Sequence, residues 1–409
     1  MIDTKIFTNE VEESALKQIE NMSNLFKDEK IRIMPDVHAG AGSVIGFTMK
    51  IESDTPIIPN IVGVDIGCGV TGTNIGEVDI DFKTLDEYIR KNIPYGFSVN
   101  QDITKGFARL DKLKCYKEIK KKERVYQSIG SLGGGNHFIE VDEAKNGDKW
   151  LIVHSGSRNL GKQIADYYQK LAYETMIDKQ KEERQNIINN IPPKERERAI
   201  KDMNFEKIDK QTAMLILKKD KDDYLNDMII AQEFAQLNRR EILSKIVEFL
   251  HLNYDFELKD YINSTHNYIS SDMYIRKGAI NASKGKKLFI PINMRDGVII
   301  GIGKGNEDWN YSAPHGAGRL MSRTKAKATI KLEEFINTMS DVYTTSANEN
   351  TLDEAPMAYK SINSILDNIK DTVDVNEILK PVYNFKADNN INLETVGKLI
   401  NTIYGDEDE

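Results

Sequence analysis

Short apolar runs, most of them bounded by glycine, proline or aspartate, recur towards both ends of this 409-residue chain. Runs of a few apolar residues with such boundaries are typical of β-strands. They lie at 31–34, 43–51, 61–65, 137–141, 150–153, 273–276, 288–291 and 298–302. The core of the protein must therefore contain β-structure contributed by both parts of the chain.

Helical patterns lie between and after these runs. Apolar residues recur at three- and four-residue steps over 11–26, 84–91 and 162–177, and further helices are predicted at about 331–339 and 359–369. From 179 to about 221 the composition is highly charged, and 222–250 then has the pattern of a long helix or a helical pair. We therefore predict an α+β fold, with mixed sheets in a single body and a helical insertion at about 179–251.

Charge and cysteine content limit the partners and the compartment. Fifty-six Lys and Arg against 64 Asp and Glu give a net charge of −8, which excludes a uniformly basic nucleic-acid coat but leaves room for a local basic channel. Cys68 and Cys115 are too few for a disulfide framework. The N-terminus has no basic segment followed by an apolar stretch, and no run approaches a membrane span. We expect a cytoplasmic protein that is neither exported nor inserted in a membrane.

Five candidate metal ligands stand in turn-rich segments next to predicted strands: Asp65, Cys68, His137, His154 and His266. Thiolate, imidazole and carboxylate together suit a borderline divalent ion such as zinc, manganese or cobalt. Five donors exceed one tetrahedral shell, and two ions bridged by a thiolate would use them all. A single histidine beside a strand is more often a structural residue, but these histidines adjoin Gly, Ser, Asn or Thr, whereas His251 lies in a helical pattern.

Two glycine-dense segments, 131–136 and 312–319, allow backbone amides to approach an anion closely. Neither segment matches a P-loop or a Rossmann fingerprint. The second contains His315, and Arg319 and Arg323 follow it, so its imidazole is a candidate nucleophile towards phosphorus. The alternative is a structural histidine in a glycine turn. Met294-Arg-Asp-Gly297 has methionine where lysine-type ligases have their lysine, so any nucleotidyl transfer must use another nucleophile.

Taken together, the ordered motifs of this chain resemble the RtcB family of RNA-splicing ligases. The motifs are Asp36-Val-His-Ala-Gly, Val64-Asp-Ile-Gly-Cys-Gly, Gly134-Gly-Asn-His-Phe138, His154-Ser-Gly-Ser-Arg, His266-Asn, Arg276-Lys-Gly-Ala279, His315-Gly-Ala-Gly-Arg and Lys386. The resemblance implies an RtcB-like body over 1–386 that surrounds a metal and nucleotide site. It also implies an enzyme of RNA repair and tRNA splicing that joins a 3′-phosphate or 2′,3′-cyclic phosphate RNA end to a 5′-hydroxyl end, using GTP and two Mn²⁺ ions.

The resemblance also implies roles for individual residues. Cys68 would bridge two ions, with Asp65 and His137 on one and His154 and His266 on the other, and His315 would take up GMP. Arg158 and Lys277 are candidate contacts to RNA phosphate or triphosphate, and an archease-type helper is a candidate partner. The cofactor-binding set is Asn136, His137, Phe138, Ile139, Glu140, His266, Asn267, Pro291, Ile292, Asn293, Met294, Val298, His315, Gly316, Ala317, Gly318 and Lys386.

This chain departs from the family pattern at two places. Many relatives have Pro-Gly-Ser-Met where it has Pro291-Ile-Asn-Met294, and Val298 replaces an expected serine. We expect Ile292 to crowd a loop that glycine leaves open, with consequences for nucleotide preference. The chain also continues past Lys386, which predicts a C-terminal extension over 387–409 with an acidic tail.

Two other functions use the same residues. A dinuclear metal-dependent phosphoesterase would act on RNA ends with water as the nucleophile, and it would need neither His315 nor GTP. A non-catalytic protein that binds RNA ends would have lost nucleotide binding through the altered 291–294 segment. Labelling by GTP that depends on His315 distinguishes the ligase from both. Turnover that survives His315→Ala without GTP indicates the phosphoesterase, and tight RNA binding with no effect of GTP on thermal stability indicates the end-binding protein.

Overall fold

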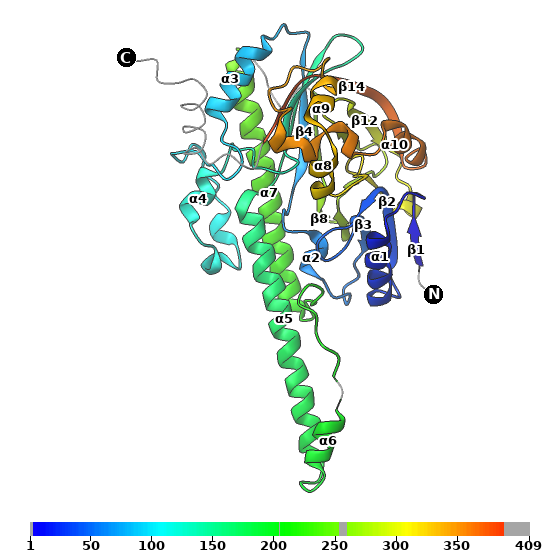
Figure 1. The fold of residues 1–409 in the computed structure, drawn as a ribbon. Helices are drawn as coiled ribbons and strands as arrows, with labels where there is room; N and C mark the ends of the chain where they lie inside the picture. Colours follow the sequence, from blue (N-terminus) through cyan, green and yellow to red (C-terminus); the bar gives the residue numbers. More distant parts are fainter. Residues whose placement is uncertain (1–2, 204, 253–259, 388–409) are drawn as a thin grey trace.

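A seven-stranded sheet forms the centre of the computed structural model, which describes residues 3–203, 205–252 and 260–387 (Figure 1). Its strand order is β11-β12-β14-β5-β6-β4-β7, and every neighbouring pair is antiparallel. In that order the strands span Lys287–Asn293, Gly297–Gly303, Val373–Lys386, Phe138–Glu143, Lys149–Ser155, Gly69–Gly76 and Tyr261–Thr265. The amide of Phe289 on β11 donates to Ser264 Oγ on β7 at 2.9 Å, so the two edge strands meet and the sheet curls almost into a barrel.

Two smaller sheets complete the β-structure. The five-stranded sheet has the order β1-β2-β3-β9-β8, and β10 pairs with β13 in a two-stranded sheet. The pairing of β1 with β2 is parallel. The bounds in chain order are β1 Asp3–Ile6, β2 Lys30–His38, β3 Ile45–Lys50, β8 Asn267–Ile269, β9 Tyr274–Lys277, β10 Ala279–Asn281 and β13 Ser312–Pro314. Strands from both ends of the chain therefore share each of the two larger sheets.

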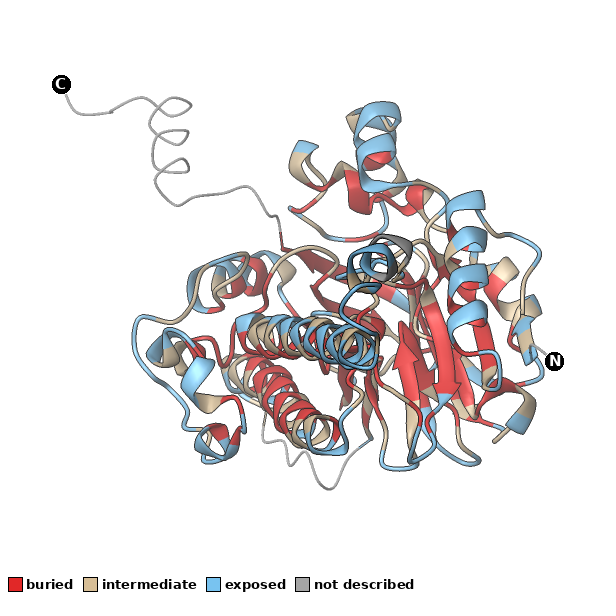
Figure 2. Ribbon diagram, turned by 90° about the horizontal axis from the view of Figure 1, so that it is seen from below, coloured by how far each residue is buried: buried red, intermediate tan, exposed pale blue. Residues whose placement is uncertain are grey.

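Helices cover the outside of the sheets, and two long ones run side by side for part of their length, the first of which projects from the body (Figure 1). These are α5 (Arg158–Asn189) and α7 (Lys218–Phe249), with α6 (Arg196–Asp202) at the far end of the projection. The strands are mostly buried, whereas surface helices expose one side (Figure 2). The other α-helices are α1 Glu13–Leu25, α2 Pro59–Val62, α3 Phe82–Asn92, α4 Lys122–Gln127, α8 Arg323–Thr329, α9 Leu332–Thr338 and α10 Ile362–Asn368.

The predicted α+β class is confirmed, and most predicted strands and helices have counterparts in the structure. The strand expected at 61–65 was wrong. Residues Pro59–Val62 form α2 instead, because Pro59 stands at the start of a helix, where its fixed φ is favourable, and Gly63 ends it at φ +96°. β14 was not predicted, because its 14 residues mix charged and apolar side chains without clean alternation.

The segment predicted as an insertion at about 179–251 contains two different environments. Its charged first part forms the outer half of α5 together with α6, and is mostly exposed. In contrast, α7 contributes Phe234 to one hydrophobic core cluster and Ile242 and Ile246 to a second. The insertion itself stays a prediction. The predicted C-terminal extension lies, except for Ala387, outside the described residues. None of the helices within the described ranges has the length and apolar character needed to cross a membrane.

Candidate active site

The five predicted metal ligands are brought together by neighbouring strands of the seven-stranded sheet. Cys68 directly precedes β4, His137 directly precedes β5, and His154 lies in β6 between those two strands. His266 follows β7, and its amide donates to the carbonyl of Cys68 at 2.9 Å. Asp65 stands in the turn between α2 and β4. Residues from four distant parts of the sequence thus meet at one end of the sheet.

The donor atoms form a continuous cluster around the Cys68 sulfur. Cys68 Sγ lies 3.5 Å from His137 Nε2 and 3.3 Å from His154 Nε2. On one side Asp65 Oδ2 lies 3.3 Å from His137 Nε2, and on the other His266 Nε2 lies 3.4 Å from His154 Nε2. We call Asp65, Cys68, His137, His154 and His266 the donor cluster. Its order, with the thiol in the middle, suits a bridging role for Cys68.

Hydrogen bonds orient the histidine rings of the donor cluster. The carbonyl of Leu132 accepts a hydrogen bond from His137 Nδ1 at 2.8 Å, and that of Asn136 accepts one from His154 Nδ1 at 3.2 Å. A protonated Nδ1 leaves the Nε2 lone pair aimed at the cluster, which is the usual arrangement of metal-binding histidines. Burial holds the pKa of His154 and of His266 well below the usual range, so both rings stay neutral and able to bind a metal.

Two glycines leave space for the donor cluster. A Cβ at Gly156 would overlap the carboxylate of Asp65. Gly133 has φ +88°, and a Cβ there would overlap the Arg158 guanidinium and lie 2.7 Å from His137 Nδ1. The glycine-rich segments noted in the sequence therefore permit close packing around the ligands.

The donor cluster fits divalent metal ions. Its atoms are one sulfur, three imidazole nitrogens and a carboxylate oxygen, and the Cys68, His137 and His154 donor atoms all lie within 4.8 Å of one another. His266 Nδ1 is buried and has no hydrogen-bond partner among the described residues. Burial and the charge of Asp65 raise the pKa of the Cys68 thiol well above its ordinary value in the metal-free protein. A metal ion would therefore displace the thiol proton as it binds.

His315 lies beside the donor cluster and is held by a buried carboxylate. Asp36 Oδ2 accepts hydrogen bonds from the His315 backbone amide at 3.0 Å and from its Nδ1 at 2.6 Å. The His315 ring centroid lies 4.6 Å from that of His266. Because Nδ1 donates to Asp36, Nε2 keeps its lone pair, and the imidazole is prepared to act as a nucleophile.

We expect Asp36→Asn to slow covalent nucleotide uptake by about 10- to 100-fold, the usual cost of losing an orienting partner. An amide can offer its NH₂ group to Nδ1 and so favour the tautomer in which Nε2 is protonated. The measurement is the single-turnover rate of labelling by α-labelled GTP. Asp86→Asn is the matched control, because Asp86 is also buried but pairs with Arg90 and Tyr383 instead of His315. A wild-type labelling rate in Asp36→Asn would contradict the positioning role.

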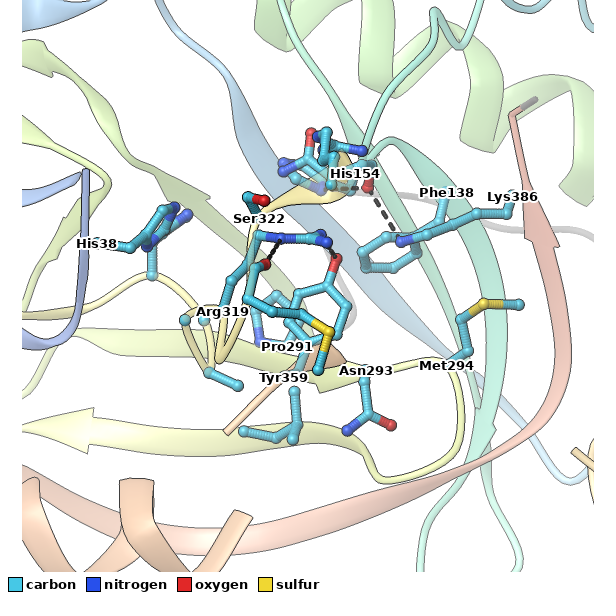
Figure 3. Close-up of a pocket in the computed structure, with 18 of the residues that line it drawn as sticks. His38, Phe138, His154, Pro291, Asn293, Met294, Arg319, Ser322, Tyr359 and Lys386 are labelled. Atoms are coloured by element: carbon cyan, nitrogen blue, oxygen red, sulfur yellow. Dashed lines mark hydrogen bonds between the residues drawn. The ribbon is translucent and has the colours of Figure 1, made fainter. Parts of the chain in front are cut away.

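His315 opens into a cavity of about 570 Å³ that also includes His154 of the donor cluster (Figure 3). Lys386, at the end of β14, extends over the ring of Phe138, with its Nζ 5.1 Å from the ring centroid. Lys386 Nζ also donates to the carbonyl of Asn136 at 3.3 Å. Arg319 and Tyr359 lie on another wall, and their side chains are hydrogen-bonded at 3.2 Å. The cavity thus combines an imidazole, an aromatic ring and fixed cations. We call it the His315 cavity.

Most of the predicted nucleotide contacts line the His315 cavity, namely Asn136, Phe138, Glu140, Pro291, Ile292, Asn293, Met294, His315, Gly316, Ala317, Gly318 and Lys386. Three lie elsewhere. Ile139 and Val298 are buried in core clusters, and the side chain of Asn267 donates to the carbonyl of Asp65 at 3.2 Å. His137 and His266 belong to the donor cluster instead. Lys277 does not line the His315 cavity. Its ammonium donates to the carbonyls of Ala41 and Asn60 instead.

Ile292 does not lie in a loop, because residues 291–293 belong to β11 and only Met294 follows that strand. Ile292 also lines the His315 cavity, so the expected effect of its side chain on nucleotide preference stays a prediction. Ile292 is buried in a core cluster with Ala313 and Ala317. β11 pairs with β12 alone, and its register shifts between Pro291 and Asn293. An outer strand tolerates Pro291, which lacks an amide donor.

Glu354 was missed by sequence reasoning. Its carboxylate lies 3.1 Å from Lys386 Nζ and 3.4 Å from an Arg319 nitrogen, and it also pairs with Arg323. Burial raises the pKa of Glu354, but the charges of Lys386 and Arg323 outweigh it and lower that pKa to about 2. Glu354 therefore stays ionised and anchors the cations of the cavity. In the sequence, Glu354 stands in a short acidic segment that does not differ from an ordinary exposed run of acidic residues, so its role could not be predicted.

Comparison with known proteins shows the family of this chain. The family described as tRNA-splicing ligase RtcB matches residues 18–117 and 104–387. The chain belongs to the RtcB family. It is 30% identical to RNA-splicing ligase RtcB1 of an Escherichia coli strain, over 91% of this chain and 94% of that protein. It is also 30% identical to RNA-splicing ligase RtcB of Escherichia coli K12, with the same coverage. Identity to tRNA-splicing ligase RtcB of Aeropyrum pernix is 26%, over 87% of each chain.

The donor cluster, Asp36, His315 and Lys386 all fall within the RtcB match. Asp36, Asp65 and Cys68 fall in its first part, and the histidines and Lys386 fall in its second. The match ends one residue after Lys386.

Proposed function

We propose that this protein is an RNA ligase that joins a 3′-phosphate or 2′,3′-cyclic phosphate end to a 5′-hydroxyl end, with GTP and two Mn²⁺ ions. The observation that carries the proposal is the position of His315. Its ring is held by Asp36, lies beside a five-donor cluster and faces a cavity with a fixed cation at Lys386. A phosphoesterase that uses water would not need a histidine oriented in this way outside the donor set.

In the first step of the proposed reaction, the cavity activates the nucleotide. Neutral His315 Nε2 attacks the α-phosphorus of GTP, so that a P–N bond forms and the P–O bond to pyrophosphate breaks. Lys386 is placed to neutralise phosphate charge, since its ammonium is held at the wall of the same cavity. The product is GMP joined to His315 through a phosphoramidate.

In the next two steps the nucleotide passes to RNA and then leaves. An oxygen of the RNA 3′-phosphate attacks the GMP phosphorus and displaces His315, which forms an RNA-ppG end. The 5′-hydroxyl of the second strand then attacks the 3′-phosphorus, loses its proton and expels GMP. Divalent ions held by the donor cluster would polarise phosphate oxygens and favour loss of that proton. Holding both RNA ends in the correct position and orientation supplies much of the remaining increase in the rate of joining.

We propose that Glu140 recognises guanine. Its buried carboxyl lines the His315 cavity, and Asn384 Nδ2 donates to its Oε1 at 2.6 Å. Guanine presents N–H donors at N1 and N2, whereas adenine presents an acceptor at N1. An ionised carboxylate that still has lone pairs available therefore favours guanine. Recognition of guanine by the Glu140 carboxylate would give the proposed preference for GTP over ATP, even without nucleotide contacts from residues 291–294.

This proposal predicts a pH-dependent preference for guanine. Burial raises the pKa of Glu140 to about 7, and the charge of Lys386 opposes that rise only in part. Below a pH of about 7 the Glu140 carboxyl is protonated, and it then accepts fewer hydrogen bonds from guanine. The ratio of GTP to ATP affinity should therefore fall as the pH falls, by up to roughly tenfold per pH unit. Isothermal titration of both nucleotides measures this ratio. A pH-independent ratio in the wild type, or an unchanged ratio in Glu140→Gln, would contradict this role.

RNA joining tests the proposed function directly. One RNA carries a 3′-phosphate and the other a labelled 5′-hydroxyl, and both are incubated with the protein, manganese and GTP. We expect a joined product that requires GTP. Loss of the 3′-phosphate without GTP and without joining would assign the metal-dependent phosphoesterase instead. RNA binding with neither reaction would assign an end-binding protein.

The proposed substrates place the protein among enzymes of RNA repair and tRNA splicing. Both cysteines are free and buried, in agreement with the reducing compartment inferred from the sequence, and we propose a cytoplasmic enzyme.

A further inference from the structure

A second cavity, of about 590 Å³, also reaches the donor cluster. It includes Asp65 and His137, whereas the His315 cavity includes His154. Its walls come from residues 96–99, from α4 and from the start of α5. Asp65 is the single acidic residue of its lining, against four basic residues: Lys121, Arg124, Arg158 and Lys162. We call it the basic cavity.

Most cations of the basic cavity have no carboxylate beside them. Of the four, only Lys162 forms an ion pair within the described part of the chain, with Asp166 at 2.6 Å. Arg124 donates instead to the backbone carbonyl of Phe97 at 2.5 Å, and Arg158 donates to that of Gly96 at 2.8 Å. A neutral carbonyl orients a guanidinium but does not cancel its charge. The basic cavity therefore keeps a positive potential that attracts an acidic group.

The described chain ends beside the basic cavity. The amide of Ala387, the last described residue, donates to the carbonyl of His137 at 3.4 Å, and His137 lines the cavity. Residues 388–405 connect Ala387 to the acidic run at 406–409. A connection of that length spans about 27 Å even when all of it is helical, and more when it is extended. The acidic run can therefore reach the walls of the basic cavity.

The segment 388–409 carries the opposite charge to the basic cavity. It contains six Asp and Glu residues against one lysine, and four of the acids are consecutive at 406–409. Its net charge of −5 is most of the −8 of the whole chain. A segment attached next to a cavity has a high effective concentration there, in the millimolar range for a short linker. Charge and point of attachment thus favour this segment over a free anion as the occupant.

We propose that the C-terminal segment 388–409 folds back over the basic cavity, with the carboxylates of 406–409 paired with Lys121, Arg124 and Lys162. In that position it competes with external polyanions for access to the donor cluster. The docking follows from charge and attachment alone. Its consequence, restricted access of RNA to the site, rests on the proposed function.

Carbodiimide cross-linking tests the docking directly. The reagent joins a carboxylate to a lysine amine in contact with it, with loss of water, and mass spectrometry of the digested full-length protein locates the amide. We expect links from 406–409 to Lys121 or Lys162, at a yield that salt lowers and that does not depend on protein concentration. Lys218 is the control, because it is exposed and lies outside the cavity. Equal links to Lys218, links only between two copies of the chain, or no links to Lys121 and Lys162 would overturn the proposal.

Binding of a polyanion tests the competition. The probe is a fluorescent single-stranded RNA without terminal phosphates, added to the full-length protein with manganese but without GTP. The tail variant combines Asp406→Asn, Glu407→Gln, Asp408→Asn and Glu409→Gln. We expect it to bind the probe about tenfold more tightly at low salt, the effect of removing a competitor that fills about 90% of the sites. Its affinity should also fall more steeply with salt, because the RNA no longer replaces existing ion pairs.

A control variant with the same change in net charge separates docking from general electrostatics. It combines Glu182→Gln, Glu183→Gln, Glu195→Gln and Glu206→Gln, four exposed positions in the segment between α5 and α7 and at the end of α5. We expect it to bind the probe as the wild type does. Equal tightening in both variants, or unchanged affinity in the tail variant, would overturn the competition.

Labelling by α-labelled GTP separates failure of this inference from failure of the proposed function. The tail variant should label as fast as the wild type, because the basic cavity and the His315 cavity share no lining residue. Cross-links to Lys121 or Lys162 in a wild type that takes up no GMP would refute the ligase function and leave the docking intact. Normal labelling without those cross-links would refute the docking alone.

Discussion

Replacing His315 with alanine is expected to abolish covalent uptake of GMP. The imidazole is the proposed nucleophile, and Asp36 Oδ2 holds it in place by accepting hydrogen bonds from the His315 backbone amide and from its Nδ1. Loss of a nucleophile commonly removes several orders of magnitude of rate, roughly a millionfold where it has been isolated. The protein is incubated with manganese and α-labelled GTP, with labelled ATP in parallel, and separated on a denaturing gel. We expect label from GTP in the wild type and none in the variant.

The controls for this experiment distinguish chemistry from folding. His251→Ala removes an exposed histidine outside the site and should label normally. The metal content of His315→Ala, measured by elemental analysis, should equal that of the wild type, because His315 lies outside the donor cluster. Persistent labelling of His315→Ala would exclude it as the nucleophile. Absence of label in a metal-loaded wild type would favour the phosphoesterase or the end-binding protein.

Replacing Cys68 with serine is expected to remove most of the bound metal. Cys68 Sγ is central in the donor cluster, 3.5 Å and 3.3 Å from the Nε2 atoms of His137 and His154. A serine hydroxyl is a harder and far less acidic donor, so it bridges borderline ions poorly. Loss of a supporting residue already costs about 10- to 100-fold in metal affinity, and loss of the central ligand should cost at least that much. Elemental analysis after dialysis measures the occupancy.

Cys115→Ser is the matched control for the metal experiment. Cys115 is also buried, but the carboxylate of Asp227 accepts from its backbone amide at 2.9 Å, and it lies outside the donor cluster. Its metal content should be unchanged. Full metal stoichiometry in Cys68→Ser would contradict the bridging role, and metal loss from Cys115→Ser to the same extent would point to a general loss of structure.

The sequence alone determined the chemistry of the donor cluster and its nucleophile. Thiol, imidazole and carboxylate residues stand beside glycines at the ends of apolar runs, and these signals are local, so they can be read without knowing how the runs pair. The α+β class could also be predicted from the sequence, because apolar runs and helical periodicity are local signals too. The segment 61–65 shows the limit of such signals, since an apolar run of that length fits a strand or a short helix, and the position of Pro59 decided between them.

Only the tertiary structure decided which residues act together. Asp36 and His315 are 279 positions apart, and they meet because β13 packs beside β2. Glu354 anchors Lys386 across the end of β14, and Arg124 and Arg158 donate to the carbonyls of Phe97 and Gly96 from 27 and 62 positions further along the chain. In each case the partner is set by strand pairing and packing between distant segments, whose energy depends on the whole core. The residues next to each partner in the sequence do not predict those contacts, so the orientation of His315 and the shape of the site are determined only in the folded protein.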